Sequence, residues 1–425
     1  MNYFVLCFLL MGLGATTVWA QPISSDELAS KKTYKSLEEA LANPEDVYKL
    51  DLRNQKLNEL SADITKLKKL QVLMASNNNI QALPSGIDKL KNLQILQLDK
   101  NDITELPNSI QKLLYLESIN LRYNQVMAFP ENFLAAPLLK TVDLRDNQIK
   151  TFPAKPAKTA VNVEVLLLGY NELSTLPNYI TSYENLKRLD LAGNKFTRIP
   201  EDLVQCKKLE SLDISYNREM NWRQAFDILS KTENLQELFA NGMDARQLPE
   251  TIKQLTKLKK LHLKDCQYTT LPEGFLELTA LEELDLSNTP LETLPNNLGK
   301  LKNLKVLYAN NCQLEELPQD IGDAVELRQL FLNNNKLKTL PFGFGQLFRL
   351  QNLYLSSNQI NSLPNSVGGL VSLHNLELQN NKLTSLPDGV KVLDKLTGLY
   401  LSNNPLDNYD FEKLQVALPL TYISY

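Results

Sequence analysis

A repeat of 23 residues constrains the fold of this chain more than any other feature of its 425 residues. From residue 47 onward the pattern L-x-x-L-x-L-x-x-N-x-L-x-x-L-P-x-x-I-x-x-L-x-x recurs, for example as LQILQLDKNDITELPNSIQKLLY at 93–115. Stacked units of fixed period lengthen a single domain without enlarging its core cross-section, so the chain does not need several cores. Sixteen units align on the Asn position, at Gln55, Asn78, Asn101, Asn124, Asn147, Asn171, Asn194, Asn217, Met243, Cys266, Thr289, Cys312, Asn335, Asn358, Asn381 and Asn404.

Each recurring position of the repeat has a structural role. The L-x-x-L-x-L segment predicts a short strand with inward leucines, and strands of successive units are expected to pair into one parallel sheet. The Asn follows where the chain turns inward, because its amide can donate and accept hydrogen bonds at a turn that leaves backbone groups unpaired. The proline that follows fixes an extended return across the outer side.

These motifs resemble the leucine-rich repeat family, specifically its 23-residue "LPxxI" type. That type occurs in many bacterial repeat proteins, secreted ones included, and in Ras-regulating and polarity scaffolds of eukaryotes. The resemblance covers residues 47–425. It implies an α/β solenoid of horseshoe shape with about 16 repeats, a parallel concave β-sheet and an irregular or short-helical convex side. We expect the solenoid to span 47–404.

Both ends of the array are expected to carry caps, since terminal repeats would otherwise expose their leucines. Residues 21–46 form the N-terminal segment, in which Ser36 and Glu39 predict the start of a capping helix. Residues 405–425 predict a short helix that ends before Pro419, followed by a final strand, with no further domain expected after it.

The first twenty residues predict a secretory signal peptide. An apolar stretch from Tyr3 to Leu13 precedes small residues and VWA, an A-x-A-like site that places cleavage after Ala20. The residues before this stretch include no Lys or Arg, and the run to Ala20 nearly reaches the length of a membrane span, so an uncleaved anchor is the alternative. Export leads us to expect a secreted or periplasmic protein with no membrane span after signal removal.

Two units deviate in length. The fifth is one residue longer at AKPAKTAVNV (154–163), where we expect a convex loop. The eighth is three residues longer and lacks Leu-Pro, and Trp222, Ala225, Phe226 and Leu229 have helical spacing. We expect a true helix on the outer side that packs on the core, with a partner-docking face as the alternative.

The Asn position is replaced in four consecutive units, from Met243 to Cys312. Cys and Thr can donate a hydrogen bond in place of the amide and Met cannot, which predicts local loosening. Cys266 and Cys312 lie two units apart, about 10 Å at the spacing of strands, which is too far for a disulfide.

No constellation for catalysis, cofactor binding or metal binding is evident in the sequence. A net charge of −4 argues against a nucleic-acid ligand. The only histidines, His262 and His374, are more than a hundred residues apart, and no phosphate-binding or hydrolase motif occurs. Asp190 and Asp213 fall on adjacent strands, but carboxylates on an open sheet are expected to stay solvated and untuned for catalysis.

The outward-facing position in the middle of each strand separates the two halves of the array. In the first half it is mainly acidic or amide, whereas aromatic residues dominate from Phe239 onward. We interpret this second half as a ligand-binding stripe on the concave face, because exposed apolar patches with polar rims mark contact sites. The alternative is that the rings only brace neighbouring strands. The stripe comprises Phe239, His262, Asp285, Tyr308, Phe331, Tyr354, Glu377 and Tyr400.

A secondary candidate lies at the strand exits, where Tyr123, Tyr170 and Tyr216 recur on every second unit. The sequence thus favours a non-catalytic recognition module that binds a protein, peptide or glycan outside the cytoplasm. The alternatives are an intracellular regulatory scaffold of a small-GTPase-type pathway and an accessory subunit of an enzyme.

Overall fold

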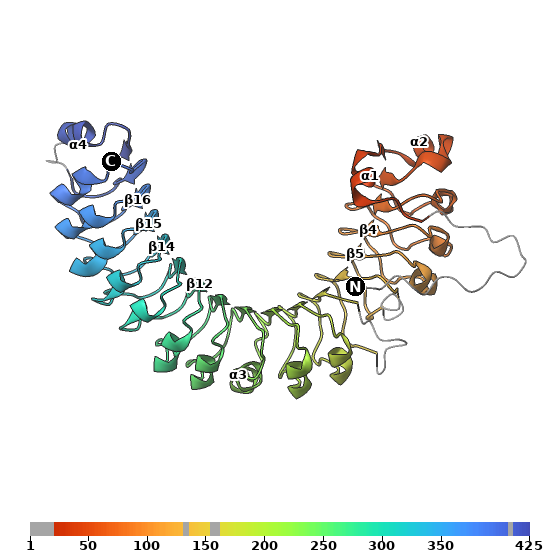
Figure 1. Ribbon diagram of the computed structural model, residues 1–425, viewed down its shortest axis with the longest axis horizontal. Helices are drawn as coiled ribbons and strands as arrows, with labels where there is room; N and C mark the ends of the chain where they lie inside the picture. The colour runs from red at the N-terminus through yellow and green to blue at the C-terminus, as the bar shows by residue number, and fades with distance from the viewer. Residues whose placement is uncertain (1–20, 131–135, 154–161, 407–410) are drawn as a thin grey trace, which may run out of the picture.

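The computed structural model describes residues 21–130, 136–153, 162–406 and 411–425. The expected signal peptide and most of the expected loop at 154–163 lie outside these ranges. Figure 1 shows an open horseshoe whose strands line the inner, concave side and whose helical turns line the outer, convex side. The predicted leucine-rich repeat solenoid is therefore confirmed.

A single parallel sheet of 18 strands forms the concave face. Each strand pairs with the strands before and after it in sequence, and equivalent positions of successive units are in register, for example Leu330 with Leu353. The strands are β1 (Thr33–Tyr34), β2 (Lys49–Asp51), β3 (Val72–Met74), β4 (Ile95–Gln97), β5 (Ser118–Asn120), β6 (Thr141–Asp143), β7 (Val165–Leu167), β8 (Arg188–Asp190), β9 (Ser211–Asp213), β10 (Glu237–Phe239), β11 (Lys260–His262), β12 (Glu283–Asp285), β13 (Val306–Tyr308), β14 (Gln329–Phe331), β15 (Asn352–Tyr354), β16 (Asn375–Glu377), β17 (Gly398–Tyr400) and β18 (Tyr422–Ser424).

The convex side consists mostly of short 3₁₀ helices that begin directly after an extended proline, as η8 does after Pro249 (φ −66°, ψ 143°). Proline fixes this backbone angle and lacks the N–H that a helix start leaves unpaired. The 3₁₀ helices are η1 (Pro44–Asp46), η2 (Ala62–Lys66), η3 (Ile87–Lys89), η4 (Asn108–Lys112), η6 (Asn178–Ser182), η7 (Glu201–Gln205), η8 (Glu250–Gln254), η9 (Glu273–Glu277), η10 (Leu298–Lys300), η11 (Ile321–Asp323), η12 (Phe342–Gln346), η13 (Asn365–Gly369) and η14 (Asp388–Val392).

The core is a continuous row of leucines between the two sides. Leu96, Leu98 and Leu116 are fully buried, as are their equivalents along the solenoid. One unit alone would leave these side chains in water, so each unit is stabilised by the burial that its neighbours provide.

The Asn position forms the expected hydrogen-bonded ladder. The Nδ2 group of Asn101 donates to the carbonyls of Ala75 (3.0 Å) and Leu98 (2.9 Å), and its Oδ1 atom accepts from the N–H of Ile80 (3.0 Å). One side chain thereby ties two units together. The residue before each ladder position has a left-handed backbone, with φ between 54° and 67°.

The interrupted part of the ladder keeps only substitutes for these bonds. The Cys266 Sγ atom accepts from the N–H of Met243 at 3.3 Å and lies 3.6 Å from the carbonyl of Ala240. Cys266 and Cys312 are free and buried. Burial raises the pKa of the Cys266 thiol to about 12, so it stays a neutral donor.

The helices are where the sequence predicts them, with one addition. α2 (Leu37–Ala42) begins at Ser36, whose side chain accepts from the N–H of Glu39, and α4 (Phe411–Ala417) precedes β18. α3 (Trp222–Leu229) lies on the outer side and buries its apolar face, as expected for core packing. α1 (Ser25–Ser30) is not predicted from the sequence. None of its residues is buried, so the helix lacks the periodic apolar face that marks a helix in a sequence.

Candidate binding surface

Three aromatic rings form a continuous stack on the concave face. Tyr308, Phe331 and Tyr354 are in register on β13, β14 and β15. The ring centroids of Tyr308 and Phe331 are 4.5 Å apart and those of Phe331 and Tyr354 are 4.4 Å apart, with interplanar angles of 18° and 5°. All three rings are half-buried. The stack confirms that the rings contact one another across strands, and it leaves their edges toward the concave space.

Carboxylates close the stack at both ends. Asp285 is in register with Tyr308 on one side, and Glu377 is in register with Tyr354 on the other. Burial, followed by the negative charge of Glu377, raises the pKa of the Tyr354 hydroxyl, and burial raises the pKa of Glu377. Tyr354 and Glu377 are therefore partly desolvated.

The remaining stripe residues flank this stack on neighbouring strands. The rings of Phe239 and His262 meet edge to face at 4.8 Å, and His262 Nε2 is 2.9 Å from Glu283 Oε1. Tyr400 contacts Tyr422 of the terminal strand at 5.9 Å. The structure thus divides the eight predicted residues into a central stack of three rings, one carboxylate at each end of it, the pair of Phe239 and His262, and Tyr400.

The polar rim beside the stack is internally bonded. The Asn310 Oδ1 atom accepts from the N–H of Asn333 (2.8 Å), and Asn333 Oδ1 accepts from the N–H of Ser356 (2.7 Å). These amides are held in fixed orientations, so the surface beside the rings is preformed.

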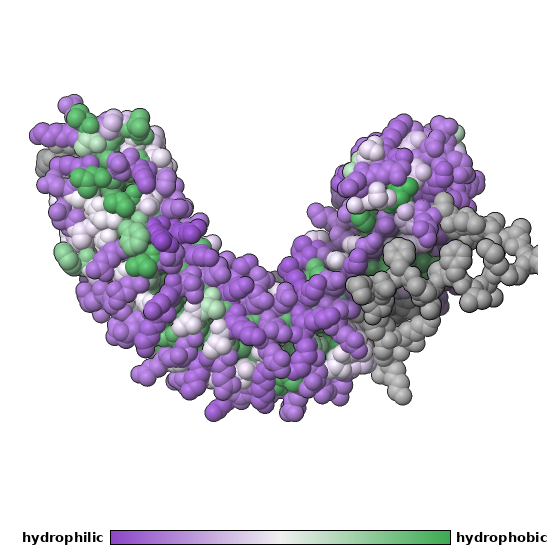
Figure 2. All heavy atoms as spheres, in the orientation of Figure 1, coloured by the Kyte–Doolittle hydropathy of each residue, from purple (hydrophilic) through white to green (hydrophobic). Residues whose placement is uncertain are grey.

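Apolar surface is unevenly distributed on the face seen in Figure 2. Green residues gather over the arm that carries the C-terminal repeats, and hydrophilic residues dominate the opposite arm. The exposed side chains on this arm include Phe342 on η12 and Val392 on η14, which lie on the outer side and not in the stripe.

The tyrosines at the strand exits have structural contacts. Tyr170 and Tyr216 lie against glycines of the following unit, because a Cβ atom on Gly193 or Gly242 would come within 2.5 or 2.4 Å of their rings. The Tyr216 hydroxyl donates to Asp265 Oδ2 at 2.6 Å, two units further on. Tyr123 lies under the Arg122 guanidinium, 4.5 Å from the ring centroid. Tyr123 and Tyr170 remain exposed.

The acidic half of the concave face differs from expectation. Asp190 was expected to be solvated, yet it is only 6% exposed. Burial, and then the charge of Asp213, raises the pKa of Asp190 to about 6, and burial also raises the pKa of Asp213. The expectation was wrong because an Asp side chain is short and this carboxylate lies against the backbone of Gly169 on the neighbouring strand's exit.

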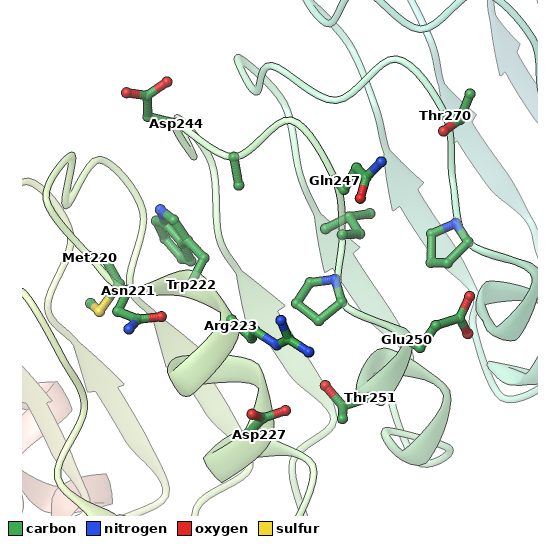
Figure 3. Close-up of a pocket in the computed structure, with 14 residues that line it drawn as sticks. Met220, Asn221, Trp222, Arg223, Asp227, Asp244, Gln247, Glu250, Thr251 and Thr270 are labelled. Carbon is green, nitrogen blue, oxygen red and sulfur yellow. The ribbon is translucent and has the colours of Figure 1, made fainter.

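A hollow on the outer side was not predicted. A cavity of about 760 Å³ separates the start of α3 from η8 in the repeat that is three residues longer. Figure 3 shows Trp222, Arg223, Asp227, Gln247, Glu250 and Thr251 around it. The indole Nε1 of Trp222 and the hydroxyl of Thr251 are buried without a hydrogen-bond partner. The longer helix displaces the chain from the next unit and leaves this gap.

Neither a metal centre nor a membrane span is found in the part of the chain that the structure describes. No group of three or more His, Cys, Asp or Glu side chains in those ranges could hold an ion. Within the same ranges no helix is both long and apolar enough to cross a bilayer.

Family models cover most of the repeats. A leucine-rich repeat region matches residues 48–149, a leucine-rich repeat model matches 137–196, and a two-copy model matches 184–222 and 279–321. The R13L1/DRL21 leucine-rich repeats match 207–289, and a single repeat matches 349–370. Among curated proteins, none matches the sequence.

Solved structures show the same architecture. A leucine-rich repeat protein of Leptospira interrogans is 32% identical, with a TM-score of 0.73, and the match covers 93% of this chain and 100% of that chain. The functional domain of InlJ from Listeria monocytogenes is 23% identical, with a TM-score of 0.57, over 86% of this chain and 69% of that one.

A plant receptor ectodomain is a more distant match. The leucine-rich repeat ectodomain of the Arabidopsis thaliana receptor kinase GASSHO1/SCHENGEN3, solved in complex with CASPARIAN STRIP INTEGRITY FACTOR 2, is 24% identical with a TM-score of 0.56. The match covers 90% of this chain and 55% of that one. At this identity the likeness concerns the fold.

Proposed function

This chain belongs to the leucine-rich repeat family, and from that premise we propose that it is a non-catalytic recognition module that binds a protein or peptide on its concave face. The observation that carries the proposal is the stack of Tyr308, Phe331 and Tyr354 on consecutive strands, half-buried and open to the concave space. Aromatic side chains of this kind dominate the energetics of protein interfaces.

The stack favours a protein or peptide over a glycan. Sugars pack on the open face of an aromatic ring, whereas both faces of Phe331 are covered by its neighbours. Ring edges and the Tyr308 and Tyr354 hydroxyls suit apolar side chains and backbone carbonyls, which are the groups that a protein surface supplies.

We place the binding event outside the cytoplasm. The support is the signal-peptide pattern of residues 1–20. The plant receptor ectodomain with a bound factor and the Drosophila Toll–Spatzle complex (24% identity, TM-score 0.66) are fold neighbours, and here they serve as analogies for a ligand-binding solenoid. Cell fractionation with intact-mass analysis tests the setting. We expect an exported chain that begins at Gln21, and a cytosolic chain that retains Met1 would favour the intracellular scaffold.

The binding surface is tested by replacing Tyr308, Phe331 and Tyr354 together with Ser. Ligand captured by the wild-type chain from extracellular material is identified, purified and titrated against both proteins. We expect affinity to fall by a few kcal/mol, as for aromatic hot spots. The two ring contacts contribute about 0.5–1.5 kcal/mol each to stability, so the variant is expected to unfold somewhat earlier but to remain folded.

Phe342→Ser supplies the matched control, since Phe342 is 81% exposed on η12 and has no place in the stripe. This variant should bind as the wild type does. Wild-type affinity of the triple variant, combined with a lower melting temperature, would show instead that the rings only brace the sheet.

A further inference from the structure

Two concave-face aspartates are paired with basic side chains of this chain. Asp51 and Asp143 occupy the outward position of β2 and β6, and each is followed two residues later by an arginine. Arg145 Nε lies 3.0 Å from Asp143 Oδ1 and its Nη2 lies 2.6 Å from Oδ2, while Arg53 makes the same two-point contact with Asp51 at 2.9 and 2.8 Å. The Lys35 ammonium also lies 2.6 Å from Asp51 Oδ2, so the two-point arginine contact is what the two sites share. A planar guanidinium matches a carboxylate in this two-point geometry.

Asp190 and Asp213 occupy the same position on β8 and β9 but lack this arginine. Ala192 and Ser215 stand in its place. The only hydrogen bond to Asp190 among the described residues comes from the N–H of Ala192 to Oδ1 (3.0 Å), so Oδ2 has no partner there. Neither carboxylate takes part in an ion pair within that part of the chain, although Asp190 is more than nine-tenths buried.

The two carboxylates are adjacent and form a recess in which Asp190 is buried and Asp213 is half-buried. They are directly paired in the register of β8 and β9. The Asp190 carboxylate rests on the bare backbone of Gly169, where a Cβ atom would come within 2.7 Å of Oδ1. The small residues Gly169 and Ala192 form the floor. Two like charges side by side in a half-dry recess are costly unless a cation joins them.

The charged groups around the recess do not supply that cation. Arg145 is engaged by Asp143, and Arg188 extends from the exposed position two residues before Asp190. Burial and the charge of Asp213 raise the pKa of Asp190 more strongly than these two arginines lower it. The recess thus retains a negative charge with no ion-pair partner among the described residues. Burial, followed by the charges of Asp213 and Asp190, raises the pKa of the Tyr170 hydroxyl.

We propose that Asp190 and Asp213 form a receptor site for the guanidinium of an arginine side chain presented by the protein ligand. The inference rests on the proposed function and specifies the partner: a basic segment that enters the middle of the concave face. The ligand's arginine would occupy the place that Arg53 and Arg145 fill at the equivalent positions of this chain. Two carboxylates supply too few ligands for Ca²⁺, which takes six to eight oxygens, and no group of three or more His, Cys, Asp or Glu side chains among the described residues could hold an ion.

The site is tested with N-acetyl-arginine amide as the probe and the uncharged isostere N-acetyl-citrulline amide as its control. Methyl NMR of the full chain follows Leu167 and Ala192, which lie beside Asp190. We expect saturable shifts of both signals with the arginine compound and none with citrulline. Equal shifts with both compounds, or none with either, would overturn the proposal.

Two variants address the site from opposite directions. Asp190→Asn together with Asp213→Asn keeps the side-chain shape and should weaken probe binding at least tenfold. Ala192→Arg rebuilds the internal pair seen at Asp143 and Arg145, so it should abolish probe binding while the melting temperature rises. Undiminished binding in either folded variant would contradict the assignment.

Failure of this site and failure of the proposed function are distinguishable. β8 and β13 are five strands apart, so the triple Ser variant at Tyr308, Phe331 and Tyr354 should bind the arginine probe as the wild type does. If the triple variant binds both the arginine probe and the protein ligand as the wild type does, only the proposed role of the aromatic stack is refuted. If the triple variant fails to bind the arginine probe, the recess is not a site separate from the aromatic stack, and the proposal as stated is wrong.

Discussion

Replacing Asp190 with Asn should stabilise the protein at neutral pH, which is unusual for a change at a buried position. The folded-state pKa of Asp190 is about 6 against a usual value of 3.8, because burial and the charge of Asp213 disfavour the ionised form. The folded state therefore binds more protons than the unfolded state between these two values. Stability is lost as the pH rises through this window, and below it the penalty is absent.

The size of the effect follows from the shift. About two pKa units at about 1.4 kcal/mol each give a penalty of roughly 3 kcal/mol above pH 6. Asn cannot ionise and can still accept from the N–H of Ala192 through its Oδ1 atom. The gain should approach 3 kcal/mol at pH 7, shrink between pH 6 and 4, and vanish near pH 3.

Urea denaturation of both proteins at a series of pH values measures this difference. Arg145, Arg188, Asp213 and Tyr170 face the carboxylate, and they are unchanged in the comparison. Asp143→Asn is the matched control of opposite sign, since it leaves Arg145 without its two-point partner and should cost about 1–2 kcal/mol at pH 7. A destabilised Asp190→Asn protein at pH 7, or a gain independent of pH, would refute the reasoning.

Three further outcomes are expected. Asn335→Ala should cost about 2–4 kcal/mol in urea denaturation, because it leaves the buried N–H of Leu314 and the carbonyl of Ala309 unpaired, whereas the carbonyl of Leu332 keeps its bond from Asn358; a cost below 1 kcal/mol would contradict the ladder's role. Trp222→Phe should be nearly neutral in melting temperature because the indole N–H has no partner, whereas Trp222→Ala should cost about 3–5 kcal/mol. Hydrogen exchange should be fastest between Met243 and Cys312, where sulfur and hydroxyl groups replace the amide; uniform protection would show that these replacements are neutral.

Most of the scaffold follows from the sequence. The period of 23 predicts the strands, the Asn ladder and the prolines because each role recurs with the same neighbours in every unit. Helical spacing at Trp222, Ala225 and Phe226 likewise predicts α3 without knowledge of its surroundings. Local pattern is sufficient here, since each unit repeats the packing of the one before it.

The site was less predictable, because exposure of a concave side chain depends on side chains from other units. The alignment of units does show Ala192 and Ser215 where Arg53 and Arg145 stand, so the missing cation was visible in the sequence. The absence of this arginine matters only because Asp190 is buried, and the repeat pattern does not reveal that burial. The sequence also did not predict that the three rings stack on one another. One outward position per strand fixes the spacing of the rings but not their tilt.

The hydrogen bond from Tyr216 to Asp265 restricts how the gene for such a chain can change. In a strictly regular array a duplication or deletion of one whole unit joins equivalent surfaces, so such an array can gain or lose units by unequal recombination. Here the Tyr216 ring crosses Gly242 and its hydroxyl reaches a carboxylate two units away. Removal of the unit that contains Gly242 would bring Tyr216 against the side chain of Asp265 in place of a glycine, and both its packing and its hydrogen bond would be lost. We therefore expect units eight to ten to be inherited together as one block of three.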